Sequence, residues 1–204
     1  MRKILLVAAL AVLAAAVNAQ ATFGVKAGAN FSNLKYSGEG EDDNTDMKVG
    51  LNIGALANVP ISEMFSFQPE VVFSMEGGKE EEDGETGKIN LNYINVPLLL
   101  QYNASGFIAE TGPQVGFLMS AKVKYEIDGD EEEIDVKDDL EGINLSWAIG
   151  LGYKMPSGFG VNARYNLGLS NISKDDSEGD FKTKANTIQV GVFYTFGGGA
   201  SARK

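Results

Sequence analysis

The chain has 204 residues, a formal net charge of −11, and neither histidine nor cysteine. The acidic balance argues against nucleic acid or an anionic lipid surface as a partner of the acidic regions. The lack of histidine excludes Ser-His catalysis, and the lack of cysteine leaves stability to packing or to a bilayer. The sequence predicts no enzyme, no catalytic residue, no metal site and no cofactor.

The N-terminal segment has the features of an export signal. Arg2 and Lys3 precede an apolar stretch over residues 4–17. This stretch is shorter than the roughly 17–25 apolar residues of a membrane-spanning helix and fits the core of a signal peptide. We predict a signal peptide over residues 1–19, a barrel over 20–196 and a short tail over 197–204. After cleavage, 15 basic residues would remain against 28 acidic ones.

Alternation of apolar and polar residues with a period of two predicts eight β-strands. They cover residues 23–34, 48–59, 64–75, 89–102, 106–123, 142–154, 158–170 and 184–196. Each has at least the roughly 9–11 residues of a tilted transmembrane strand. No segment after residue 19 could form a spanning helix, so a membrane form of this chain would have to be a closed barrel.

The predicted connections alternate between short and long. The short ones cover residues 60–63, 103–105 and 155–157, and the long ones 35–47, 76–88, 124–141 and 171–183. This alternation is typical of an all-β, eight-stranded, antiparallel, up-and-down transmembrane barrel. The even strand number puts both termini on the short-turn side. We expect that side to face the periplasm and the long loops to be extracellular.

Acidic residues concentrate in the four long connections, which hold 25 of the 28. The three exceptions are Glu63, Glu70 and Glu110. Asp42, Asn44 and Asp46 have the first spacing of an EF-hand loop but lack its glycine and its final glutamate. We therefore expect solvated loop tips that bind divalent cations weakly.

Aromatic residues stand at or near the short-turn end of seven predicted strands. They are Phe23, Phe65, Tyr102, Phe107, Tyr153, Phe159 and Phe196. Ordinary β-propensity would also enrich Phe and Tyr in strands. Their placement at one end favours a girdle at the periplasmic membrane interface.

Lysines gather where the predicted strands meet the long loops. They are Lys35, Lys48, Lys88, Lys122, Lys124, Lys182 and Lys184. This is the level of lipopolysaccharide phosphates in an outer membrane, and a lysine can reach such a phosphate with its long stem. We expect contacts with lipopolysaccharide, with local balancing of the acidic loops as the alternative.

The strands over residues 142–154 and 158–170 separate an apolar row from a row rich in Gly, Asn and Ser. A soluble, ligand-holding barrel would turn the apolar row inward and leave a surface too poor in charge. With the apolar row outward, four charged residues face the lumen: Lys26, Glu70, Glu110 and Arg164. Because eight strands enclose only enough room for side chains, we expect ion pairs that fix the barrel rather than a gated ion path.

Four segments resemble PorT-like, porin-family outer-membrane β-barrel proteins. They are Gly24-Val25-Lys26-Ala27-Gly28 with Asn30-Phe31-Ser32, Asn95-Val96-Pro97-Leu98-Leu99-Leu100, Gly112-Pro113-Gln114, and Ala163-Arg164-Tyr165-Asn166-Leu167-Gly168-Leu169. The resemblance implies an integral barrel in a Gram-negative outer membrane and says little about activity.

Two functions remain open: a structural or surface-interaction protein, and a narrow porin-like channel or transporter for small solutes. The expected partners are outer-membrane lipid, lipopolysaccharide and, during insertion, the barrel-assembly machinery.

Overall fold

The computed structural model describes residues 21–38, 41–82, 85–127, 130–174 and 182–196. The strands are β1 (Thr22–Gly38), β2 (Glu41–Asn44), β3 (Lys48–Pro60), β4 (Phe65–Glu82), β5 (Glu85–Ala104), β6 (Phe107–Ile127), β7 (Asp130–Asp135), β8 (Ile143–Lys154), β9 (Phe159–Gly168) and β10 (Lys182–Phe196), with one 3₁₀ turn, η1 (Lys137–Asp139). The predicted signal peptide and C-terminal tail lie outside these residues. No described helix is long and apolar enough to cross a membrane.

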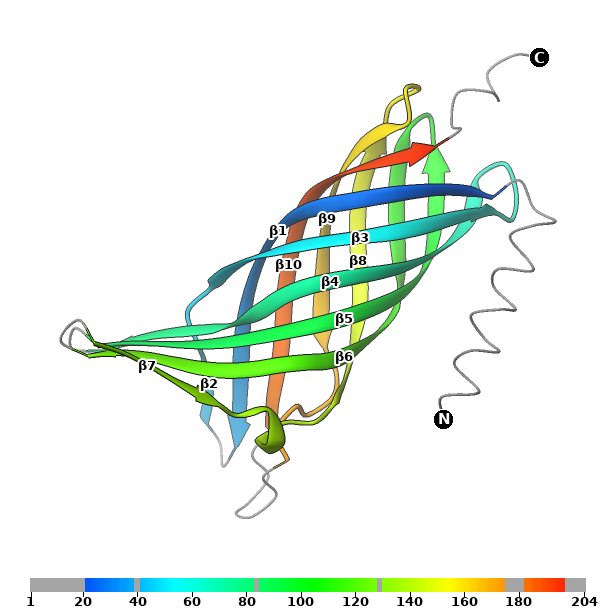
Figure 1. Cartoon of the computed structure of the whole chain (residues 1–204). Helices are drawn as coiled ribbons and strands as arrows, with labels where there is room; N and C mark the ends of the chain where they lie inside the picture. The colour runs from blue at the N-terminus through cyan, green and yellow to red at the C-terminus, as the bar shows by residue number, and fades with distance from the viewer. Residues whose placement is uncertain (1–20, 39–40, 83–84, 128–129, 175–181, 197–204) are drawn as a thin grey trace.

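Eight strands close into a barrel (Figure 1). Their order is β1, β3, β4, β5, β6, β8, β9 and β10, and β10 pairs antiparallel with β1 from Phe23↔Phe196 to Ser37↔Lys182. Closure pairs the edge strands with each other, as backbone in a hydrocarbon layer requires. The predicted eight-stranded antiparallel barrel is confirmed.

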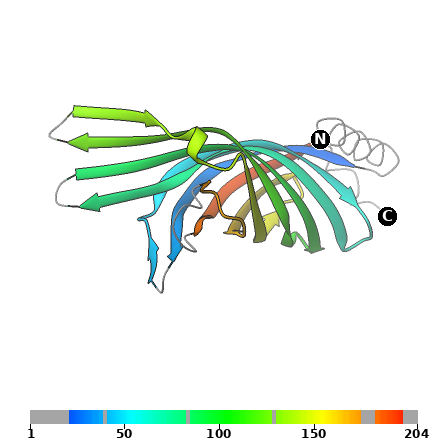
Figure 2. The ribbon, with the colours of Figure 1, turned by 90° about the horizontal axis from the view of Figure 1, so that it is seen from below.

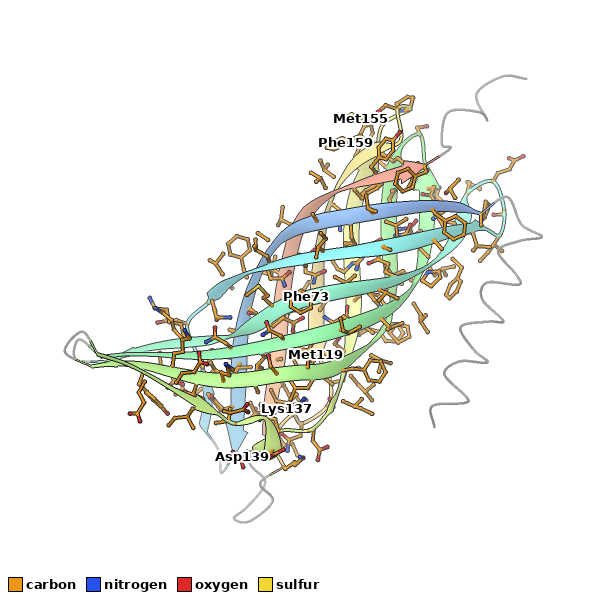
Figure 3. All side chains as sticks on the ribbon, in the orientation of Figure 1. Phe73, Met119, Lys137, Asp139, Met155 and Phe159 are labelled. Atoms are coloured by element: carbon orange, nitrogen blue, oxygen red, sulfur yellow. The ribbon has the colours of Figure 1, made fainter. Side chains whose placement is uncertain are left out.

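The wall of the barrel separates two kinds of side chain. Outward-facing Leu51, Ile149 and Leu151 are 64%, 58% and 68% exposed, whereas inward-facing Asn30 and Ser146 are buried. A soluble protein rarely exposes so many large apolar side chains together, so this outer face is suited to lipid. In Figure 3, Met155 and Phe159 lie at one end of the barrel, and Lys137 and Asp139 lie at the other.

The predicted strand ends are accurate beside the short turns and wrong beside the first three long connections. β1 continues to Gly38 and pairs there with β2. β4 and β5 stay paired out to Glu82↔Glu85, and β6 continues to Ile127, where it pairs with β7. The acidic sequence predicted loops there, but ladder hydrogen bonds join backbone groups and tolerate polar side chains.

The distal parts of β4, β5 and β6, together with β7, form what we call the projecting sheet. It covers residues 77–82, 85–92, 119–127 and 130–135. Figure 2 shows it extending beyond the mouth of the barrel and diverging from the β1–β2 hairpin. Both described chain ends lie at the opposite end of the barrel (Figure 1).

Candidate functional site

The four charged residues predicted to face inward meet around Arg164 of β9. The Arg164 guanidinium donates to Glu70 through Nη1 at 2.9 Å and Nη2 at 2.8 Å, and its Nε donates to Glu110 at 2.9 Å. Lys26 Nζ donates to Glu70 Oε2 at 3.0 Å. The four side chains are at most 4% exposed. We call them the Arg164 cluster; its two cations and two anions balance.

Amide side chains complete the hydrogen bonding of the two carboxylates. Gln68 Nε2 donates to Glu70 Oε1 at 2.9 Å, and Gln101 Nε2 donates to Glu110 Oε2 at 2.8 Å. Asn58 Nδ2 in turn donates to the side-chain oxygens of both glutamines, at 3.1 and 2.9 Å. Every carboxylate oxygen in the cluster thus accepts at least one hydrogen bond, which offsets the desolvation of the buried charges.

The space left at this level is small. The cavity beside the Arg164 cluster measures about 10 Å³, close to the least volume that can hold one water molecule. Leu56, Ile108 and Phe193 also line it. Phe193, the residue that breaks the alternation of β10, lies over Gly160, where an added Cβ would come within 2.2 Å of the ring. Side chains therefore fill the lumen here.

The structure corrects the placement of Glu76, which the sequence put in a loop. Glu76 is 3% exposed, and its Oε1 accepts hydrogen bonds from Ser74 and Asn95, both at 2.8 Å. The run of acidic residues after it suggested a loop, but β4 continues and keeps the inward parity of Glu70 and Ser74. Glu76 is two residues from Ser74 and six from Glu70, and this even spacing is the signal in the sequence that could have identified Glu76 as inward-facing.

The structure also corrects Lys48, which was expected at the outer rim. Its neighbour Val49 is 67% exposed on the outer face. Strand alternation therefore turns Lys48 inward. Its Nζ donates to the backbone oxygen of Glu76 at 2.9 Å.

An apolar cluster closes the lumen at the end nearer the long connections. Its buried members are Leu34, Leu91, Tyr93, Leu118, Ala121, Ile172 and Ala185. Val136 and Leu140 pack against it from the connection between β7 and β8. Ile172 comes from the connection between β9 and β10, so two of the long connections supply apolar side chains to this closure.

The middle of the lumen, between the Arg164 cluster and the apolar cluster, is polar. Asn30 Nδ2 donates to Ser74 Oγ at 2.8 Å, and Asn52 Nδ2 donates to Asn30 Oδ1 at 2.7 Å. Some buried polar atoms in the described chain lack a hydrogen-bond partner, among them both side-chain polar atoms of Asn166 and Thr187 Oγ1. The middle is thus less fully hydrogen-bonded than the Arg164 cluster.

All seven aromatic residues predicted for the girdle are exposed on the outer face. Two neighbouring pairs are in ring contact, with centroids 5.4 Å apart for Phe65 and Tyr102 and 5.1 Å apart for Phe107 and Tyr153. Phe23 stands opposite Phe196 across the β1–β10 seam. The sequence overlooked Tyr194, which contacts Phe196 at 5.4 Å.

The remaining rim lysines fall into two groups. Lys35 stands directly opposite Lys184 on β1 and β10, and Lys182 follows two residues away. Lys88 stands directly opposite Lys124 on β5 and β6, with Lys122 beside them. Within the described residues, no group of three or more acidic side chains is arranged to hold a metal ion. Weak cation binding by the loops stays a prediction.

Comparison with known proteins agrees with this architecture. The family profile for the outer membrane protein beta-barrel domain matches residues 18–174. None of the curated proteins matches the chain in sequence.

Among solved structures, Neisserial surface protein A is 14% identical, covering 86% of this chain and 99% of its own, with a TM-score of 0.51. Ail, the attachment invasion locus protein of Yersinia pestis, is 16% identical over 86% of this chain and 98% of its own, with a TM-score of 0.47. OprG of Pseudomonas aeruginosa is 15% identical over 86% of this chain and 95% of its own, with a TM-score of 0.42.

Proposed function

The chain belongs to the outer membrane protein beta-barrel family, and on this premise we propose that it is a sealed barrel with a structural or surface-interaction role. The observation that carries this proposal is the Arg164 cluster, which leaves a cavity of only about 10 Å³. A hydrated ion needs a continuous aqueous path, and eight-stranded barrels enclose just enough room for side chains. The apolar cluster at the other end is a second barrier. In this proposal the lumen is a packed core and the functional surfaces are external.

The proposed orientation puts the chain ends and the aromatic girdle at the periplasmic interface. The long hairpins, including the projecting sheet, would then be extracellular. Export by a signal peptide over residues 1–19 and insertion by the barrel-assembly machinery belong to this proposal. The proposal also includes no catalytic activity, because the chain has no histidine and most of its acidic residues lie on the hairpins.

Conductance in a planar lipid bilayer tests the sealed lumen. We expect no discrete conductance steps from the refolded wild-type chain. The double variant R164A/F193A removes the cation and the aromatic ring that fill the narrowest level, and it should give open events if it inserts. Variant L151A, on the lipid-facing side of β8, is the matched control and should stay silent.

A narrow channel is the second candidate, and the polar middle of the lumen favours it. Its asparagine and threonine side chains could be hydrated if the two closures moved apart. Stepwise conductance from the wild-type chain would support this candidate and contradict the sealed barrel.

A further inference from the structure

One polar atom beside the Arg164 cluster is buried without a hydrogen-bond partner among the described residues. It is Oδ1 of Asn162, which lies on β9 two residues before Arg164. Asn162 lines the same cavity of about 10 Å³ as the Arg164 cluster. A buried acceptor without a donor is costly, and in native structures such an atom is usually bonded to protein or to ordered water. The position of Asn162 at a cavity therefore indicates a missing donor.

Glycines leave the space beside Asn162 open. Gly152 of β8 and Gly191 of β10 stand directly opposite Asn162 on its two neighbouring strands. Gly152 also lines the cavity, and a Cβ added there would lie 3.4 Å from the Asn162 Cβ and 2.9 Å from the Val161 backbone oxygen. Neither directly opposed residue carries a side chain, so neither can supply a side-chain donor to Asn162 Oδ1.

Charged groups that line the same cavity can bind a water molecule. They are Lys26 and Glu110. The hydrogen bond from Lys26 to Glu70 uses one of the three N–H groups of the ammonium. A carboxylate such as that of Glu110 has about four lone-pair sites. A water molecule here would accept from Lys26 and donate to Asn162 Oδ1 and Glu110, and about three hydrogen bonds are typical of a buried water.

The size and charge of the surroundings select water over other small ligands. A cavity of about 10 Å³ has room for roughly one water molecule. The Lys26 ammonium and the Arg164 guanidinium oppose a metal cation, and the carboxylates of Glu70 and Glu110 oppose an anion. A neutral molecule of this size that both donates and accepts hydrogen bonds is water.

We propose that one water molecule is bound in this cavity and bridges Lys26, Asn162 and Glu110. It is a further member of the Arg164 cluster and supplies the donor that Asn162 Oδ1 lacks. An isolated water molecule provides no continuous path for ions, so the site is compatible with a sealed lumen. Conductance stays the separate test of the sealed lumen, and the two proposals can fail independently.

A crystal structure of the refolded full chain, at a resolution that shows ordered water, tests the site directly. We expect a density peak about 2.7–3.2 Å from both Lys26 Nζ and Asn162 Oδ1. The peak should be absent from N162L, which removes the acceptor. It should remain in the matched variant N166L, because Asn166 lies on the other side of Arg164 along β9 and does not line the cavity.

Two results of this crystallographic test would overturn the site. The first is an empty cavity in a wild-type structure in which Lys26 and Asn162 are well ordered. The second is a peak with several oxygen contacts of about 2.0–2.6 Å, which would identify a metal ion instead of water.

Urea unfolding from lipid vesicles gives a second readout. If the water is bound, N162L loses its hydrogen bonds and should unfold at a lower urea concentration than the wild type. If the cavity is dry, the same substitution removes an unpartnered oxygen, and the urea midpoint should rise or stay unchanged. A raised or unchanged midpoint would therefore overturn the site, and a lowered midpoint supports it when the density peak is also lost.

Discussion

At the scale of single residues, Arg164 is central to the buried ion pairs of the lumen. Arg164 lies on β9 and joins Glu70 of β4 to Glu110 of β6, through hydrogen bonds of 2.8–2.9 Å. Among the described residues, the variant R164A would leave Glu70 with Lys26 as its only cation and Glu110 with none. We expect it to lose about 3–5 kcal/mol of unfolding free energy, the usual result of breaking a buried ion pair.

Urea unfolding from lipid vesicles measures this loss. The matched variant K26M should cost less, because Glu70 keeps both hydrogen bonds from Arg164. An R164A barrel as stable as the wild type would mean that the Arg164 cluster contributes little net stability.

The contact between Gly160 and Phe193 allows a second prediction at this scale. A methyl group at residue 160 would lie 2.2 Å from the Phe193 ring, so G160A should destabilise the barrel by about 1–3 kcal/mol through overpacking. In an F193A background the same substitution should cost much less, since the ring is gone. Urea unfolding of the four chains in this cycle gives the coupling. Additive effects would show that the ring moves aside without strain.

Residue-level prediction from the sequence worked where strand parity decided the outcome. Lys26, Glu70, Glu110 and Arg164 were assigned inward from alternation, and the structure brings them into contact. Glu76 was missed because local composition outweighed parity at the end of β4. Contacts between neighbouring strands, such as Phe193 with the directly opposed Gly160, depend on the register of the pairing, which one strand's sequence does not encode.

At the scale of elements, two exposed ion pairs from Glu133 to Lys122 and Lys124 link β7 to β6, in addition to the backbone pairing of the two strands. Hydrogen bonds from Lys122 and then from Lys124 hold the pKa of the Glu133 carboxyl below its usual value. A carboxyl with a lowered folded-state pKa stabilises the fold above its unfolded pKa of about 4.3, and loses that effect as pH falls through the folded value. We therefore expect the hairpin to loosen in acid.

Amide hydrogen exchange of β6 and β7 measures this between pH 7 and pH 3, after correction for intrinsic exchange. Protection should fall toward pH 3 in the wild type and change less in E133Q. Other hairpin acids titrate in this range too, so the difference between the two chains isolates Glu133. Identical pH profiles would show that its ion pairs contribute nothing to hairpin order.

Element prediction succeeded and failed for one physical reason. Within the barrel, lipid on one side and a packed lumen on the other impose strict alternation, and the eight strands were found from it. Beyond the barrel mouth both faces can be polar, so the alternation fades while backbone pairing continues. The extensions of β1, β4, β5 and β6 and the strands β2 and β7 were therefore predicted as loops.

At the scale of the whole molecule, charge and aromatic residues are distributed along one axis. Exposed aromatic rings such as Phe107 and Tyr153 mark the end with the short turns, and acidic hairpins mark the other. Lipid-facing residues lie between them. An asymmetric molecule of this kind has one favourable orientation in a bilayer with different leaflets, because the hairpin charges must stay out of the hydrocarbon.

Epitope tags on the two ends test that orientation. A short tag between β4 and β5 should be reached by antibody on intact cells, because the projecting sheet is expected outside. The same tag between β8 and β9, in the turn at Pro156 and Ser157, should be reached only after the outer membrane is permeabilised. Both tagged chains should shift in gel mobility on heating, which verifies that each barrel is folded. Labelling of the β8–β9 tag on intact cells, with the β4–β5 tag protected, would contradict the proposed orientation.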